Sequence, residues 1–307
     1  MARLRIAELT QSLSNTGARW TAAETPMSLL DEGKRNRMLG AIVPPGYAKP
    51  LATAVSPVAH YDPEVDWRDR NGNHVSPVKI QGGCGTCVSF TVAGVAEAMA
   101  SIEKGVVKDF SEADLHFCSS HGPSCTGWWH SDAFNQAMVR GLLDEKDFVY
   151  ASAFTGNDIW TGAASCLNIS DRSMKTVKLG ALNKWFHPVD VKNYLTTTGP
   201  VSAVLAVYTD FFNYKAGVYH KVSGNFEGMH CVVIVGYSES EQCWIAKNSW
   251  DVTWGENGYF KLAYGECNEG DYEKIGISGL TFPSAPSKET WLEKLIRIVS
   301  AQAALGK

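Results

Sequence analysis

The sequence contains no long apolar run, and this absence argues against a membrane-spanning helix. None of its 307 residues belongs to an uninterrupted apolar stretch of the roughly 18 to 20 residues that a span needs. An apolar signal core is also missing near the N-terminus, because the basic start meets Glu8 and polar residues first. Basic residues are not in excess either, since 28 Lys and Arg stand against 32 Asp and Glu, for a net charge of −4. We therefore expect neither a transmembrane span nor a nucleic-acid partner.

Cysteine is present in moderate number. Eight cysteines in a chain of this length are far fewer than a disulfide scaffold carries, although they allow a few bonds. Internal repeats and low-complexity tracts are absent as well. The chain is nevertheless long enough to bury one large core or two smaller ones.

The two ends of the chain differ in composition from its middle. Within residues 1–62, the segment 27–39 has the pattern of an amphipathic helix, and a tether rich in Pro and Gly follows it; a disordered leader is the alternative. Within residues 284–307, Trp291, Leu295, Ile298 and Val299 share one face of a predicted amphipathic helix. That helix either packs back onto the domain or docks to a partner or membrane surface.

The middle of the chain, residues 63–283, changes its periodicity near residue 180. Before that point, Val88 to Ile102 carry apolar residues at helical spacing and end at Gly105, and residues 131–140 predict another helix. After it, short β-rich runs dominate. A helical half over about 75–180 and a sheet half over about 181–283 predict an α+β fold with a cleft between two subdomains. The predicted strands are 201–207, 231–235, 243–246 and 258–262.

Cys87 is the first candidate for chemistry. It follows a Gly-rich loop and begins a predicted helix, where unpaired N–H groups and the helix dipole favour a thiolate. Thr86 is the expected N-cap of this helix. A thiolate is the nucleophile that acyl transfer needs.

A cysteine nucleophile requires an imidazole, and that imidazole requires an acceptor that orients it. His230 stands at the head of one predicted strand, and Asn248 follows the next strand. A hairpin that turns over residues 238–242 would bring His230 beside Asn248. The other imidazole nitrogen could then face Cys87.

These residues lie in motifs that resemble the papain family of cysteine proteases. The nucleophile loop PVKIQGGCGTCVSF (77–90), the histidine strand MHCVVIVGY (229–237) and the asparagine segment WIAKNSW (244–250) are similar to those of the family, and the match covers about 65–283. The resemblance implies a papain-like two-subdomain fold and a cysteine endopeptidase without a cofactor or metal. It implies Cys87 as nucleophile, His230 as acid/base, Asn248 as orienting group and Gln81 as oxyanion donor. Its implied substrate-binding residues are Gly85, Thr86, Gly127, Trp128, Trp129, Met229, Trp250 and Trp254.

The resemblance also implies disulfides Cys84–Cys125 and Cys118–Cys166, and these favour a secreted, periplasmic or lysosome-like compartment. Residues 20–40 resemble the short propeptides of the cathepsin B type. We therefore expect a self-inhibited precursor in which residues 40–46 cross near Cys87 in the reverse sense to a substrate. Polypeptide substrates, this N-terminal segment and cystatin-like inhibitors are the expected partners. For the last three cysteines, Cys231, Cys243 and Cys267, the sequence does not predict whether they are free or bonded.

Some positions depart from the family pattern and leave alternatives open. Thr86, Val88 and Met229 replace the usual neighbours of the nucleophile and the histidine, and Trp128 replaces a glycine, so its ring is expected to crowd the substrate backbone. An inactive papain-fold binding protein and a transpeptidase are alternative functions. Cys84 and Cys87 alone would also suit a redox pair or half of a zinc site. A zinc site could recruit His116, Cys118, His121, Cys125 and His130.

Overall fold

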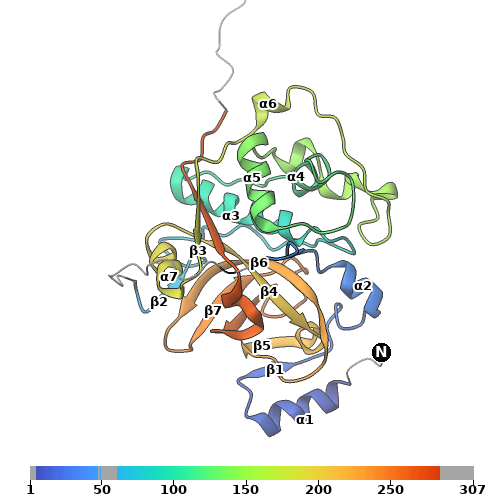
Figure 1. Cartoon of the computed structure of the whole chain (residues 1–307), viewed down its shortest axis with the longest axis vertical. Helices are drawn as coiled ribbons and strands as arrows, with labels where there is room; N and C mark the ends of the chain where they lie inside the picture. Colours follow the sequence, from blue (N-terminus) through green and yellow to red (C-terminus); the bar gives the residue numbers. More distant parts are fainter. Residues whose placement is uncertain (1–4, 48, 50–60, 284–307) are drawn as a thin grey trace, which may run out of the picture.

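The computed structural model describes residues 5–47, 49 and 61–283, and it has the predicted two-part α+β architecture. Figure 1 shows the helical half above a large twisted sheet, with α3 running between them. The helices are α1 (Ile6–Thr16), α2 (Glu32–Arg37), α3 (Cys87–Lys104), α4 (Glu112–Phe117), α5 (His130–Arg140), α6 (Arg172–Lys175) and α7 (Pro188–Thr197). The strands are β1 (Trp20–Ala22), β2 (Glu64–Asp66), β3 (Ala181–Trp185), β4 (Val201–Tyr208), β5 (Tyr214–Tyr219), β6 (Phe226–Ser238), β7 (Cys243–Lys247), β8 (Tyr259–Ala263) and β9 (Lys274–Ser278).

The helical half is organised around α3, as its apolar spacing predicts. Every residue of α3 from Cys87 to Ala100 is buried, because the helix packs on α4 and α5 on one side and on β6 on the other. Gly105 ends it in a left-handed conformation with φ of 63°, which glycine adopts without a Cβ penalty. Ser111 caps α4 by accepting a hydrogen bond from the Asp114 N–H at 3.1 Å.

The sheet half contains the predicted strands in the order β1-β5-β8-β7-β6-β4-β9-β3, and β2 pairs separately with β6. All neighbours are antiparallel except β5 and β8. The long strand β6 lies at the centre, where it contacts β4, β7 and α3. Residues 20–22 and 64–66 also join this sheet, so the sheet half takes strands from outside the predicted range 181–283.

The N-terminal segment folds against the sheet, with α1 and β1 below β5 in Figure 1. The predicted helix over 27–39 is wrong in its bounds, since only Glu32–Arg37 are helical. Thr25 and Ser28 bond to each other and form a turn, and the Asp31 side chain then caps the shorter helix by accepting from the Lys34 N–H. A non-helical turn held by side-chain hydrogen bonds therefore stands where the apolar spacing predicts the first turn of the helix.

The predicted C-terminal helix lies outside the described residues. Among those that are described, no helix has the length and apolarity required to cross a membrane.

Candidate active site

Cys87 is the first residue of α3 and is fully buried. Thr86 occupies the N-cap position, but its hydroxyl does not cap the helix as expected. It bonds instead to the Tyr150 hydroxyl at 2.7 Å, and Tyr150 also donates to the Gln81 carbonyl at 2.8 Å. Thr86 therefore fixes the nucleophile loop to the helical half through its buried side chain.

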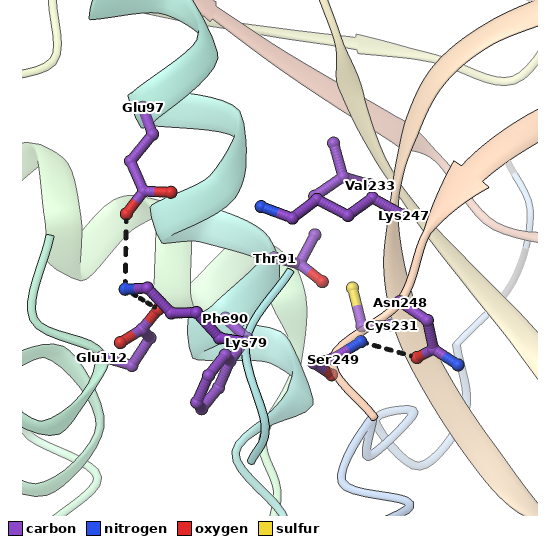
Figure 2. Close-up of a pocket in the computed structure, with 10 residues that line it drawn as sticks. All are labelled: Lys79, Phe90, Thr91, Glu97, Glu112, Cys231, Val233, Lys247, Asn248 and Ser249. Carbon is purple, nitrogen blue, oxygen red and sulfur yellow. Dashed lines mark hydrogen bonds and ion pairs between the residues drawn. The ribbon is translucent and has the colours of Figure 1, made fainter. Parts of the chain in front are cut away.

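His230 and Asn248 come together through the predicted hairpin of β6 and β7. Ser238 pairs with Cys243 across the turn, and a bulge between Ile234 and Gly236 shifts the register. His230 Nε2 lies 2.8 Å from Asn248 Oδ1. The same Oδ1 accepts the Ser249 N–H at 2.8 Å, which Figure 2 shows as a dashed line.

The Ser249 contact decides the tautomer of His230. Because the Ser249 N–H can only donate, the atom that it meets on Asn248 must be the carboxamide oxygen. His230 Nε2 must then carry the proton of this hydrogen bond, and Nδ1 is left as an acceptor. Nδ1 is buried and has no hydrogen-bond partner in the described part of the chain. The backbone N–H of Cys231, the residue after His230, acts on the Cys87 thiol, so this part of β6 lies next to the nucleophile.

Trp250 covers the hydrogen bond between His230 and Asn248. Its ring lies 4.8 Å from the imidazole, centroid to centroid, and is fully buried. Trp254 lies one ring further away, 5.1 Å from Trp250, and its indole N–H donates to the Phe212 carbonyl at 3.3 Å. The Trp254 ring is thus buried and supports Trp250, and its role in substrate binding stays a prediction.

Gln81 lies beside Cys87 with its amide orientation fixed. Its Oε1 accepts the Ser249 hydroxyl at 2.7 Å. Its Nε2 donates to the carbonyls of Cys84 and Met38, each at 2.8 Å. Ser249 thus orients both Gln81 and Asn248, a role that the sequence motifs alone did not indicate.

The N-terminal segment crosses the cleft at this point. The Ala41 N–H donates to the Met229 carbonyl at 3.2 Å, and Ile42 donates to the Trp128 carbonyl at 3.1 Å. Trp128 in turn donates to the Gly40 carbonyl at 3.0 Å, and the bridge between Ala41 and Trp128 is parallel. Residues 40–42 therefore pair with the same strand that was predicted to hold substrate.

Glycines allow this close approach. A Cβ on Gly40 would lie 1.9 Å from the Gly85 carbonyl oxygen, and a Cβ on Gly127 would lie 1.8 Å from the Gly40 oxygen. Neither distance is sterically possible without movement of the backbone. Gly85 and Gly127, both predicted from the family resemblance, thus form the narrow part of the cleft.

The ring of Trp128 does not crowd this approach as expected. It stacks on His121, with centroids 5.1 Å apart, and meets the edge of His116 at 5.7 Å. With the ring turned toward these two histidines, the main chain of Trp128 is free to pair with residues 40–42. Trp129 packs instead against Tyr47 of the N-terminal segment, at 5.1 Å.

The buried state of the site opposes the charged pair that the sequence predicts. Burial raises the pKa of the Cys87 thiol to about 11, although nearby backbone N–H groups, including that of Gly40, act in the other direction. Burial also lowers the pKa of His230 to about 4, against the effect of the Asn248 hydrogen bond. Burial therefore outweighs the N–H groups at the start of α3 in its effect on the pKa of Cys87.

A small polar pocket lies behind the site, between α3 and the hairpin (Figure 2). Lys247 Nζ donates to the Ser76 hydroxyl at 2.8 Å, and Ser76 donates to Glu97. Glu97 also accepts the Phe110 N–H at 2.8 Å and lies 3.6 Å from Lys79, which pairs with Glu112 at 2.8 Å. These buried charges connect the helical half to the strand that precedes Asn248.

Both predicted disulfides are present, Cys84–Cys125 and Cys118–Cys166. These bonds occupy Cys84, Cys118 and Cys125, which the redox and zinc alternatives would need, and leave Cys87 as a free thiol. The Cys84–Cys125 bond ties the nucleophile loop to the strand at Gly127. Cys231, Cys243 and Cys267 are free and buried.

The cleft thus brings together a thiol, an oriented imidazole and an amide donor, the set of groups that defines a thiol-dependent acyl-transfer site. A family model described as papain family cysteine protease matches residues 61–278, well over half of the chain. The chain therefore belongs to the papain family.

Individual relatives agree with this assignment. Pro-cathepsin H of Mus musculus is 34% identical over 218 residues, which are 67% of this chain and 61% of that protein. Cathepsin B-like CP3 of Giardia intestinalis is 32% identical over 203 residues, 64% of this chain and 67% of that one. The match thus spans about three fifths of the length of the first relative.

Solved structures share the fold. The proCathepsin B S9 of Trypanosoma congolense has a TM-score of 0.76 at 24% identity and covers 92% of this chain and 100% of its own. The digestive procathepsin L2 proteinase of Tenebrio molitor has a TM-score of 0.71 at 26% identity. The match covers 89% of this chain and 88% of that chain.

Proposed function

We propose that the chain is a cysteine endopeptidase made as a latent precursor, with Cys87, His230 and Asn248 as its catalytic groups. The observation that carries the proposal is the fixed tautomer of His230. Asn248 Oδ1 holds the protonated Nε2, and we infer that the unprotonated Nδ1, which has no hydrogen-bond partner among the described residues, faces Cys87. An imidazole in this state is ready to accept the thiol proton.

The reaction then follows from the positions of the groups. Nδ1 of His230 takes the proton of Cys87, and the sulfur attacks the scissile carbonyl carbon. Gln81 Nε2 and the Cys87 N–H donate to the oxyanion. His230 returns its proton to the leaving amine, and the acyl-enzyme forms. A water molecule, deprotonated by His230, attacks the acyl carbon, and the carboxylic acid and free thiol are released.

Latency follows from the direction of the N-terminal segment. Residues 40–42 run parallel to Trp128, and we propose that a substrate runs antiparallel to it. The segment fills the groove while its bonds are presented in the wrong direction for attack. Once it leaves, the cleft is open to polypeptides and to cystatin-like inhibitors. The two disulfides favour a secreted, periplasmic or lysosome-like compartment.

Covalent labelling with an epoxide inactivator of thiols tests the proposal. We expect the activated enzyme to cleave peptides and to be labelled at Cys87, and Cys87→Ala to lose both properties. Asn248→Ala should retain weak turnover, because the imidazole is then present but not oriented. Equal turnover of Cys87→Ala and wild type would refute the assignment. Absence of turnover with normal labelling would favour a binding protein, and transfer of the acyl group to an added amine would favour a transpeptidase.

A further inference from the structure

Tyr47 of the N-terminal segment is placed in the cleft by a turn. The Tyr47 N–H donates to the Pro44 carbonyl at 3.0 Å, and Gly46 has a φ of 74°. A left-handed residue at the third position is typical of a type II turn, where glycine is favoured and proline suits the second position. The sequence PPGY thus fixes the direction in which the Tyr47 side chain leaves the backbone.

The Tyr47 ring lies between two aromatic side chains of the peptidase domain. Its centroid is 5.1 Å from that of Trp129 and 5.7 Å from that of Tyr272. Trp129 and Tyr272 are themselves 5.8 Å apart. Such spacings are those of favourable aromatic pairs.

The hydroxyl of Tyr47 reaches a buried carboxylate at the end of this aromatic pocket. It donates to Glu273, which is only 4% exposed. Glu273 also accepts the Ser131 hydroxyl at 2.6 Å and lies 3.7 Å from the Nε2 of His130. Burial alone would raise the pKa of Glu273, but the His130 ring and the Ser131 and Tyr47 hydroxyls lower it well below its ordinary value. The carboxylate is therefore ionised.

We propose that Trp129, Tyr272 and Glu273 form a substrate subsite that selects a tyrosine side chain, with Glu273 as the specificity-determining residue. The proposal rests on the peptidase function above and names its substrate preference. Tyr47 occupies in the latent form the place that a substrate tyrosine takes in the active form. A phenylalanine there would leave the buried carboxylate without one hydrogen-bond donor.

The charges around Glu273 favour a neutral donor over a cation. Lys184 Nζ lies 4.0 Å from the carboxylate and donates to Ser131 at 2.8 Å. Since this ammonium already balances the negative charge, an arginine or lysine of the substrate would bring an additional positive charge to the pocket. A phenol supplies both the ring and the hydrogen bond.

A positional library of peptides tests the preference on the enzyme activated from the full chain. At one position we expect tyrosine to exceed phenylalanine in kcat/KM by about tenfold or more, as for a hydrogen bond to a charged acceptor. Glu273→Gln should reduce this ratio to near one, chiefly by lowering kcat/KM for the tyrosine peptide. The matched control is Asp271→Asn, an exposed acid two residues away, which should keep the preference. Equal cleavage of tyrosine and phenylalanine peptides at every position would overturn the proposal.

A second measurement does not depend on turnover or on a mature form. In the full chain, Tyr47→Phe should speed epoxide labelling of Cys87 about tenfold, because the segment is held less tightly. In the Glu273→Gln background the same change should have almost no further effect. Equal acceleration in both backgrounds would overturn the subsite while peptide cleavage still supports the peptidase. Loss of cleavage and of Cys87 labelling together would instead reject the peptidase function.

Discussion

The side-chain amide of Gln81 donates to the main-chain carbonyl of Met38 at 2.8 Å. The proposed oxyanion donor is thus occupied by a carbonyl oxygen of the protein's own N-terminal segment. In the proposed reaction a substrate carbonyl would make this contact, and burial raises the pKa of the neighbouring Cys87 thiol. Occupation of the oxyanion site and suppression of the thiolate are two parts of the same latent state.

The first prediction concerns Gln81 itself. In the activated enzyme, Gln81→Ala should lower kcat by about 10²- to 10³-fold with little change in KM, since the donor acts mainly on the charge that develops in the transition state. Steady-state kinetics on a peptide substrate would measure both constants. A change confined to KM would mean that Gln81 binds the ground state and does not stabilise the oxyanion.

The second prediction concerns Gly40. Gly40→Ala should expel the segment, because the new Cβ would lie 1.9 Å from the Gly85 oxygen. We expect the full-length variant to be labelled at Cys87 at least about tenfold faster than wild type. Gly33→Ala is the matched control in the same segment, where the nearest atom to a Cβ is an Asp31 oxygen at 3.4 Å. Similar labelling rates for both variants would show that the fit at Gly40 does not hold the segment.

The third prediction is a pH dependence of Cys87 reactivity. With its pKa raised to about 11 by burial, the thiol is protonated at neutral pH, and the alkylation rate of the full chain should still be rising at pH 10. In Gly40→Ala, the water that returns to the cleft should lower this pKa and move the rise to lower pH. Iodoacetamide kinetics from pH 5 to 10 would show the shift. A full-chain profile that is already flat near pH 6 would contradict the buried, neutral thiol.

The fourth prediction concerns the buried charges behind the site. Glu97→Ala should lower the free energy of unfolding by about 3 kcal/mol, because it leaves the Phe110 N–H and the Ser76 O–H without an acceptor and removes a charge beside Lys79. Urea denaturation would measure the loss. Glu8→Ala is the control, since the exposed pair of Glu8 with Arg5 should contribute under about 1 kcal/mol. Equal effects of the two changes would mean that the buried cluster does not stabilise the fold.

Helices and strands of the peptidase domain were partly predictable from local pattern, although β2, β3, β5 and β9 were not predicted. The spacing from Val88 to Ile102 and the stop at Gly105 predict α3, and the β-rich runs predict β4, β6, β7 and β8. These patterns reflect the burial of apolar side chains within each element, which depends on the local sequence. The bounds of α2 were not predictable in this way, since the turn of Thr25 and Ser28 competes with the helix through side-chain hydrogen bonds.

The sequence by itself determined the chemical groups of this protein: the thiol, the imidazole, the carboxamides and the cysteines that form its two disulfides. Their types and motifs are local properties of the chain. Only the tertiary structure decided how these groups are oriented and protonated. The Ser249 N–H selects the tautomer of His230, the Met38 carbonyl accepts from Gln81, and burial raises the pKa of the Cys87 thiol. Hydrogen-bond direction and desolvation depend on atoms that are far apart in sequence and close in space, so no local pattern encodes them.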